Sequence, residues 1–162
     1  MSEVATEPKT AQLTEGQPIS LPAVQKFQMA KYCKLGAVIG GLAVTYIGPN
    51  FLRHFGEVIE ESVPARTARQ WTLEEWTLDG PITEALGAAA RQAPLASLIQ
   101  ILEQGTEGPG LFYGESNVHY QISPTDGALW TPHWYVRGNR LGFGALPAGD
   151  KVGWEPGDKF FG

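Results

Sequence analysis

The sequence predicts an α+β protein in which a single glycine-rich transmembrane helix precedes a small domain of amphipathic helices and short antiparallel strands. Three observations lead to this fold class. Residues 35–52 form an uncharged run between Lys34 and Arg53, a helical pattern covers residues 81–104, and the last third of the chain is rich in aromatic residues and turn signals. Because a bilayer core about 30 Å thick requires roughly 20 apolar helical residues, only the uncharged run approaches the length needed to span it.

The composition limits the number of domains and the kinds of partner that we expect. A chain of 162 residues accommodates one ordinary domain, or an anchor with a domain of about 100 residues. The net charge of −5 provides no basic stripe for phosphates, so we expect no nucleic-acid partner. Charged residues make up only 18% of the chain, whereas glycine and proline number 20 and 12, which favours turn-rich structure packed against partners.

The N-terminal part is predicted to carry the anchor. Residues 1–21 show neither helical nor strand periodicity and are expected to form a disordered cytoplasmic tail. A membrane-anchor helix is expected over residues 22–62, which places the protein in a membrane as a single-pass chain. Lysines are more crowded before the uncharged run than arginines are after it, so the N-terminus is assigned to the cytoplasm. The alternative is a buried helix or a helix–turn–strand unit within a soluble domain.

Small residues recur four positions apart within the uncharged run. Gly36 and Gly40 form a GxxxG pair, and Ala37 with Gly41 repeats the spacing one residue later. Such a strip lets a second helix approach closely in lipid, so it predicts helix pairing with another subunit or another copy. Cys33 is the only cysteine and lies at the predicted membrane boundary, where it is a candidate for lipidation. The alternative for Cys33 is a small buried side chain.

Residues 63–162 are predicted to form the extramembrane α+β domain. The pattern of apolar residues over 81–104 is helical, with a break at Pro94. After residue 110, glycine, proline and aspartate separate short segments rich in aromatic and β-branched residues, which is typical of antiparallel strands. The expected strands cover residues 111–113, 118–122, 129–136 and 140–146.

No group of residues matches a compact catalytic or metal-binding motif. His119, Asp126 and His133 lie in neighbouring strand-like segments, but their spacing is not that of H-E-x-x-H. Neither a G-x-S-x-G elbow nor a G-K-[ST] phosphate loop is present. We therefore expect no catalytic residue, no metal and no cofactor. A membrane-tethered hydrolase with a site near these three residues is the alternative.

An aromatic and basic segment near the C-terminus is the candidate interface. Trp134, Tyr135, Arg137 and Arg140 lie around a predicted hairpin tip, and these residue types carry much of the energy of protein interfaces. The sequence thus predicts a non-catalytic structural or assembly subunit of a multi-protein membrane complex, with membrane lipid and other membrane-protein subunits as partners. An energy-transducing complex, a secretion or conjugation machine, or a virion membrane would each suit such a subunit. A soluble interaction protein is a further alternative.

Overall fold

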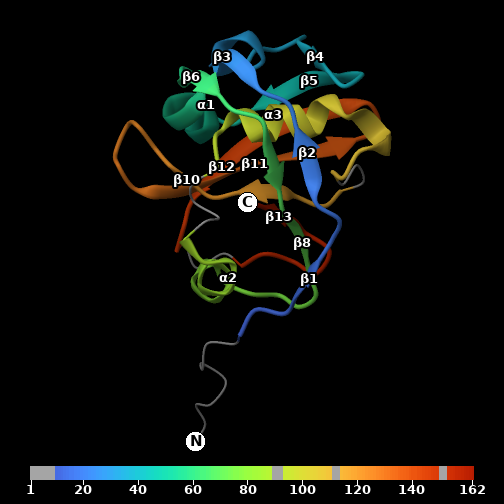
Figure 1. Ribbon diagram of the computed structural model, residues 1–162, viewed down its shortest axis with the longest axis vertical. Coiled ribbons are helices and arrows are strands. Elements are labelled where there is room, and N and C mark those ends of the chain that lie inside the picture. The colour runs from blue at the N-terminus through green and yellow to red at the C-terminus, as the bar shows by residue number, and fades with distance from the viewer. Residues whose placement is uncertain (1–9, 89–92, 111–113, 150–152) are drawn as a thin grey trace, which may run out of the picture.

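A mixed sheet of nine strands forms the centre of the protein in the computed structural model, which describes residues 10–88, 93–110, 114–149 and 153–162 (Figure 1). The order of the strands is β1-β8-β13-β9-β11-β12-β5-β4, and β10 pairs with the N-terminal end of β11. β5 runs parallel to β12 and β13 runs parallel to β9, whereas the other neighbours are antiparallel. The strands are β1 (Leu13–Glu15), β4 (Val38–Ile39), β5 (Leu42–Ile47), β8 (Gln70–Leu73), β9 (Asn117–His119), β10 (Gln121–Ile122), β11 (Leu129–Arg137), β12 (Arg140–Pro147) and β13 (Lys159–Phe161).

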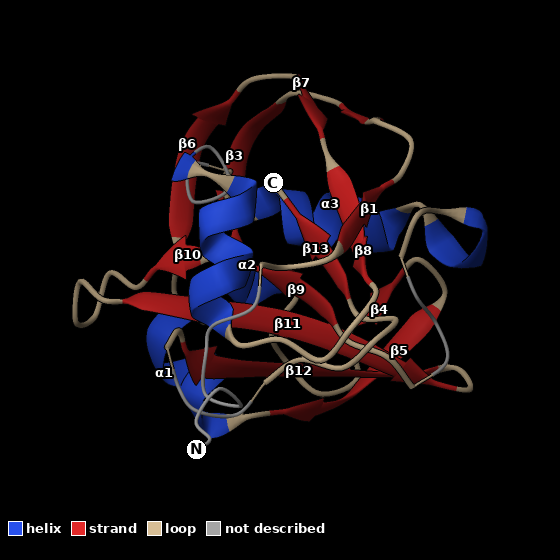
Figure 2. Cartoon of the chain, turned by 90° about the horizontal axis from the view of Figure 1, so that it is seen from below, coloured by secondary structure: helices blue, strands red, loops and turns tan. Residues whose placement is uncertain are grey.

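Two further strand pairs and several helices surround this sheet. The antiparallel pairs are β2 (Ile19–Leu21) with β7 (Arg66–Ala68) and β3 (Val24–Gln28) with β6 (Ile59–Val63). The helices among the described residues are α1 (Pro49–Phe55), α2 (Asp79–Leu86) and α3 (Ala96–Glu103), with 3-10 turns η2 (Met29–Lys31) and η4 (Gly105–Glu107). In the view of Figure 2, α2 lies in front of β9 and β11.

Side chains of the sheet alternate between two hydrophobic cores. Cross-strand partners share a face, and successive residues of a strand point to opposite faces. Trp134 and Phe143 are partners on one face and belong to the core that contains the buried residues of α3. Val118 and Phe160 are partners on the other face and belong to the core that contains the buried residues of α2. The sheet is therefore the middle layer between α2 and α3.

The glycine-rich run is a β-hairpin followed by a short helix, so the prediction of a transmembrane helix is wrong. β4 and β5 pair antiparallel, and Gly40 and Gly41 between them both have positive φ, 57° and 84°. A type I′ hairpin turn requires positive φ at both central positions, and glycine adopts it without a steric penalty. β5 then lies between β4 and β12.

No helix in the described part of the chain is long and apolar enough to cross a membrane. This finding overturns the anchor helix over residues 22–62 and the single-pass placement. The fold class is corrected as well, because the protein is built mainly on a large mixed sheet. Strands from both sides of residue 62 share that sheet, since β1 pairs with β8 and β5 pairs with β12.

The glycines of the predicted helix-packing strip lie on turns, and Ala37 lies in the connection before β4. Gly36 has a φ of 89° and, like Ala37, precedes β4, whereas Gly40 and Gly41 form the hairpin turn. The turn packs closely on α3, because a Cβ atom added to Gly40 would overlap the carbonyl oxygen of Leu102. These residues therefore do not form one face of a helix.

The helical pattern over residues 81–104 corresponds to two helices. α2 and α3 lie on either side of Pro94, which precedes the first turn of α3. The strands expected over 118–122, 129–136 and 140–146 correspond to β9 with β10, to β11 and to β12. The strand expected over 111–113 lies outside the described residues.

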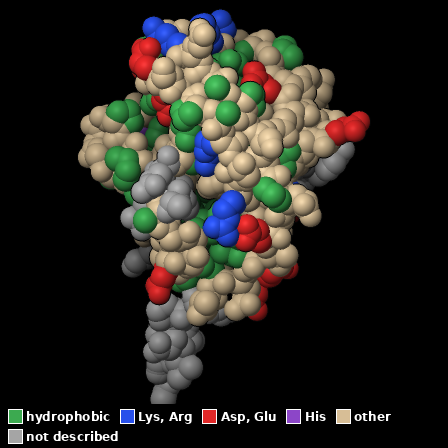
Figure 3. Space-filling view, viewed as in Figure 1, with side chains coloured by type: hydrophobic (Ala, Val, Ile, Leu, Met, Phe, Trp, Pro, Cys, Tyr) green, Lys and Arg blue, Asp and Glu red, His purple; other side chains and the backbone are tan. Residues whose placement is uncertain are grey.

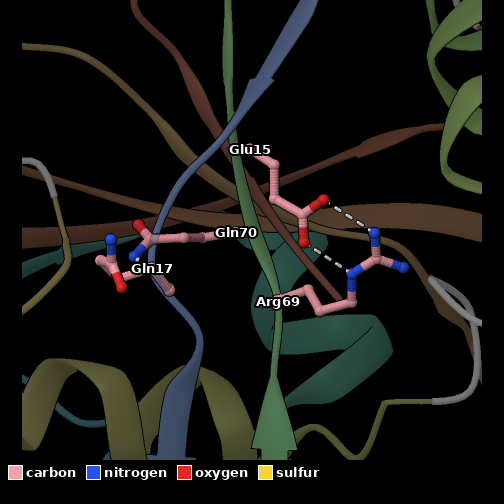
Figure 4. A network of polar contacts seen from close by, with 4 residues as sticks. All are labelled: Glu15, Gln17, Arg69 and Gln70. Atoms are coloured by element: carbon pink, nitrogen blue, oxygen red, sulfur yellow. Dashed lines mark hydrogen bonds and ion pairs between the residues drawn. The ribbon is translucent and has the colours of Figure 1, made fainter.

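A polar network ties the edge strand β1 to β8 (Figure 4). Arg69 donates from Nε and Nη2 to the two carboxylate oxygens of Glu15, at 2.8 and 2.9 Å. Its guanidinium also lies 4.8 Å from the centroid of the Trp71 ring. The adjacent Gln70 donates from Nε2 to the carbonyl oxygen of Gln17 at 2.8 Å. These contacts fasten β1 and the residues that follow it to β8 and the residue before it.

Candidate functional site

A groove of about 290 Å³ lies on the α2 side of the sheet, where β5, β11 and β12 run side by side. We call it the β12 groove. Its lining residues are Tyr46, Gly48, Pro49, Asn50, His133, Tyr135, Gly144, Ala145 and Leu146. The set combines two phenols, an imidazole and an amide with small and apolar residues, and none of these described lining residues is a carboxylate, lysine or arginine. Such a mixture of apolar surface with a few polar groups is typical of ligand sites.

Two glycines of β12 lie beneath the aromatic rings of β11 that line the groove. The antiparallel register places His133 opposite Gly144 and Tyr135 opposite Gly142. A Cβ atom added to Gly142 would lie 2.5 Å from Cζ of Tyr135, and one added to Gly144 would lie 2.7 Å from Nε2 of His133. The rings therefore occupy the space above the glycines, and any larger residue would displace them. Aromatic residues placed across from strand glycines in this way support a sheet that glycine alone would weaken.

A β-bulge turns Tyr46 toward the same groove. In the pairing of β5 with β12, Val44 is opposite Leu141 but Tyr46 is opposite Gly142, so Thr45 is an extra residue. In a regular strand Val44 and Tyr46 would share a face, and Val44 is buried in the α3 core. The extra residue reverses the alternation, as bulges do, and leaves Tyr46 50% exposed on the groove face.

His133 has a defined tautomer within the groove. Its Nδ1 lies 2.9 Å from the carbonyl oxygen of Thr131, which only accepts, so Nδ1 donates and Nε2 is the free acceptor. The ring also makes an edge contact with Trp154, with the centroids 5.5 Å apart. Burial lowers the pKa of His133, although its hydrogen bond to Thr131 acts in the opposite direction. The imidazole is therefore neutral at neutral pH and carries no charge into the groove.

Two arginines flank the groove at the tip of the β11–β12 hairpin. Arg137 and Arg140 are opposite each other across a turn whose first residue, Gly138, has a φ of 63°, as a type II′ turn requires. Both are exposed, and neither forms an ion pair with a described residue. By alternation they share the face of Tyr135. Like charges directly opposite in a sheet are destabilising, so this pair is unusual on stability grounds alone.

The charge of Arg137 reaches the phenol of Tyr135. Burial raises the pKa of Tyr135, and the neighbouring Tyr46 raises it further, whereas the Arg137 guanidinium lowers it. Tyr46 and Tyr135 both line the groove, and Arg137 lies two residues beyond Tyr135 on the same face of β11. The groove thus has a neutral aromatic part, and the positively charged Arg137 and Arg140 lie beyond one end of it.

The three residues of the alternative hydrolase site are not brought together. His133 is the partner of Val118, so His119, the next residue on β9, faces the opposite side of the sheet. Asp126 lies in the loop before β11, where its carboxylate accepts from Nε1 of Trp130 at 3.0 Å and from the amide of Ala128 at 2.9 Å. The three side chains occupy three separate environments.

His119 is a neutral residue of the α3 core. It is 1% exposed, its ring stacks on Phe161 at 5.2 Å, and neither ring nitrogen has a hydrogen-bond partner among the described residues. Burial and the nearby charge of Arg66 lower the pKa of His119 to about 3. A buried polar group without a partner is costly, which makes this residue an exception in the core.

Two buried polar clusters that the sequence did not reveal hold the fold around the groove. The carboxylate of Asp79, at the start of α2, accepts from the hydroxyl of Tyr120 at 2.6 Å, from Nε1 of Trp154 at 2.8 Å and from the amide of Gly149 at 3.0 Å. Because Trp154 also contacts His133, this carboxylate helps to position the groove wall. All of its partners are distant in sequence, so no local pattern identified it.

The second cluster pairs His54 of α1 with Ser123. Nδ1 of His54 lies 2.7 Å from Oγ of Ser123, which also accepts from the amide of Thr125 at 3.0 Å. The imidazole stacks on Trp130 with the centroids 3.9 Å apart. A serine beside a histidine resembles a nucleophile and its base, but both side chains are buried, and Ser123 is wholly inaccessible. The contact fastens the loop before β11 to α1.

No protein-family model, curated protein or solved structure matches this chain. The site therefore rests on its own geometry. Among the described residues, no group of three or more His, Cys, Asp or Glu side chains is arranged to hold a metal ion.

A second cavity, of about 270 Å³, is lined by residues that include Lys31, Lys34 and Glu57. On the face seen in Figure 3, lysine and arginine side chains gather at the end of the molecule that carries β3 and β6.

The structure distributes the sequence-predicted site residues as follows. Tyr135, Arg137 and Arg140 share the groove face, whereas Trp134 is fully buried in the α3 core on the other face. Cys33 is 7% exposed, and burial, with the charge of Glu57, raises the pKa of its thiol to about 11. A buried thiol that stays protonated is a poor acceptor for lipid attachment.

Proposed function

We propose that this protein is a non-catalytic interaction module that binds its partner through the β12 groove. The observation that carries the proposal is that several features that destabilise a β-sheet occur together on β5, β11 and β12. Two glycines stand inside a strand, a bulge interrupts a parallel strand pair, and two arginines face each other. Glycine within a strand costs about 0.5–1 kcal/mol, and such departures from local preference gather at functional sites.

The chemistry of the groove supports binding rather than catalysis. Its lining offers hydroxyls on Tyr46 and Tyr135, an amide on Asn50 and the neutral acceptor Nε2 of His133. Among the residues that the structure describes, no carboxylate lines it, and the raised pKa of Tyr135 keeps that phenol protonated. Acid–base catalysis relies on a pair of groups that exchange a proton near the operating pH. The proposal retains the expectation of a non-catalytic protein that acts through partners, without a membrane anchor.

The test is an NMR screen of the ¹⁵N-labelled full chain with a mixture of small ring compounds, namely phenol, indole, proline amide and glucose. Binding in the groove would shift the amides of Gly142, Gly144 and Ala145. Tyr46→Ala should abolish these shifts, because it removes an exposed wall of the groove. Ile122→Ala is the matched control, since Ile122 is 52% exposed on β10 and does not line the groove.

Two results decide the matter. Shifts that map to the groove, vanish in Tyr46→Ala and persist in Ile122→Ala support the proposal. If compounds shift only amides outside the groove, or if none shifts any amide at high concentration, the β12 groove is not a binding site.

A further inference from the structure

We infer that the partner of the β12 groove is an extended acidic peptide segment, whose carboxylate meets Arg137 and Arg140 while a neighbouring flat side chain enters the groove beside Tyr46, Tyr135 and His133. This inference rests on the proposed function and names the chemistry of the partner. Three independent features lead to it: the charge at the hairpin tip, the spacing of the rows across the sheet, and the polar groups of the groove.

The two guanidinium groups at the hairpin tip favour binding of an anion. In a hydrogen-bonded antiparallel pair the Cα atoms are about 5.5 Å apart, so the guanidinium groups of Arg137 and Arg140 start close together. Neither is neutralised by a described carboxylate. The tip is also fixed, because the amide of Ala43 on β5 donates to the carbonyl oxygen of Asn139 at 3.0 Å. Guanidinium groups match a carboxylate with two parallel hydrogen bonds, and one carboxylate between them would offset their repulsion.

The spacing of the rows fits an extended chain. On the groove face the rows are His133 with Gly144, Tyr135 with Gly142, and Arg137 with Arg140. Strand residues rise about 3.3 Å each, so successive rows lie about 7 Å apart. Alternate side chains of an extended peptide have the same spacing. A peptide lying along the hairpin would therefore place one residue at the arginines and the next residue of the same face beside Tyr135, which lines the groove.

The polar groups of the groove suit a peptide backbone better than a nucleic acid. The phenols of Tyr46 and Tyr135 can donate to carbonyl oxygens, and Nε2 of His133 can accept from an amide. A volume of about 290 Å³ has room for a single ring or a proline. Arg137 and Arg140 are the two positive side chains placed here by the described part of the chain, whose full sequence has a net charge of −5, whereas nucleic-acid sites neutralise many phosphates.

The test is an NMR titration of the full chain with a short capped peptide that alternates glutamate and tyrosine. The glutamine version of the same peptide is the comparison, and AMP and glucuronate are the competing anionic ring compounds. We expect the glutamate peptide to shift the amides from Tyr135 to Gly144. Arg137→Gln and Arg140→Gln should each weaken its binding about tenfold, which corresponds to about 1.4 kcal/mol for a lost charge-assisted hydrogen bond.

Lys31→Gln is the control for loss of charge, because Lys31 is exposed and lies on the second cavity. It should leave the affinity unchanged. Both arginines are exposed, so their replacement should not prevent folding, and the wild-type pattern of NMR signals outside the hairpin would verify this.

The outcomes separate the inference from the proposed function. Equal affinity for the glutamate and glutamine peptides overturns the acidic assignment, while loss of both in Tyr46→Ala would leave the groove as a binding site. Saturation of the groove by AMP or glucuronate, with neither peptide binding, likewise overturns the peptide assignment alone. If neither the peptides, the anionic compounds nor the ring compounds shift groove amides, both proposals fail.

Discussion

Replacing Asp79 tests whether one buried carboxylate holds the α2 side of the sheet together. Its two oxygens accept three hydrogen bonds, from Tyr120, Trp154 and the amide of Gly149. Asp79→Ala leaves three donors without an acceptor, and each buried unsatisfied donor costs about 1–3 kcal/mol. Partial relaxation and water entry reduce the sum, so we expect a loss of about 3–5 kcal/mol in the free energy of unfolding.

The measurement is urea unfolding followed by circular dichroism, with thermal unfolding as a second assay. For a domain of this size 1 kcal/mol corresponds to about 2–4 °C, so Asp79→Ala should lower Tm by about 6–20 °C. Asp79→Asn keeps one acceptor oxygen and should lose less. Glu84→Ala on the exposed side of the same helix is the control, and we expect a change within about 0.5 kcal/mol.

A double-mutant cycle sharpens this test. Tyr120→Phe removes one of the three donors, and burial together with Asp79 raises the pKa of Tyr120, so its hydroxyl remains a donor at neutral pH. The effects of Asp79→Ala and Tyr120→Phe should therefore be less than additive, by about 0.5–3 kcal/mol. A loss below about 1 kcal/mol for Asp79→Ala, or strict additivity, would refute the reasoning.

Three further predictions follow from the same geometry. Gly40→Ala should destabilise the protein more than Gly36→Ala in urea unfolding, because both have positive φ but only Gly40 abuts the carbonyl of Leu102; equal losses would contradict this packing. Arg140→Thr should raise the free energy of unfolding by about 0.2–1 kcal/mol at low salt, and an unchanged value would mean that the arginine pair does not repel. Burial lowers the pKa of His119 from 6.5 to about 3 in the folded protein, so the unfolded chain binds a proton at this residue at a higher pH than the folded chain does. Stability should therefore fall by about 1.4 kcal/mol per pH unit as the pH drops from about 6 to about 3, and His119→Phe should remove that part of the slope.

The transmembrane prediction failed for a specific physical reason. An uncharged run can form a transmembrane helix in lipid. It can equally form an interior strand of a sheet that packs against a hydrophobic core. β5 is such a strand, since it lies between β4 and β12 and contributes Leu42 and Val44 to the α3 core. The pair Gly40-Gly41 between apolar segments was the local signal for a hairpin. The partner β12 lies about a hundred residues away, and no local pattern specifies it.

The candidate site was predictable only in part. Tyr135, Arg137 and Arg140 were singled out because exposed aromatic and basic residues carry interface energy. Trp134 was grouped with them, but adjacent residues of a strand point to opposite faces of the sheet. Trp134 faces the core beneath α3, and the packing of α3 on that face is a tertiary feature. Tyr46 was not identified at all, because its position depends on a bulge in its pairing with β12.

Local chemistry specified the turns and breaks of this chain. Gly87, with a φ of 78°, follows the last residue of α2, Pro94 lies just before α3, and the Gly138-Asn139 pair closes the β11–β12 hairpin, because each acts on the φ and ψ of its own neighbourhood. The order of strands, their register and the face that each side chain takes came only from the folded protein. Those features depend on contacts between residues far apart along the chain, where burial of apolar surface outweighs local preference.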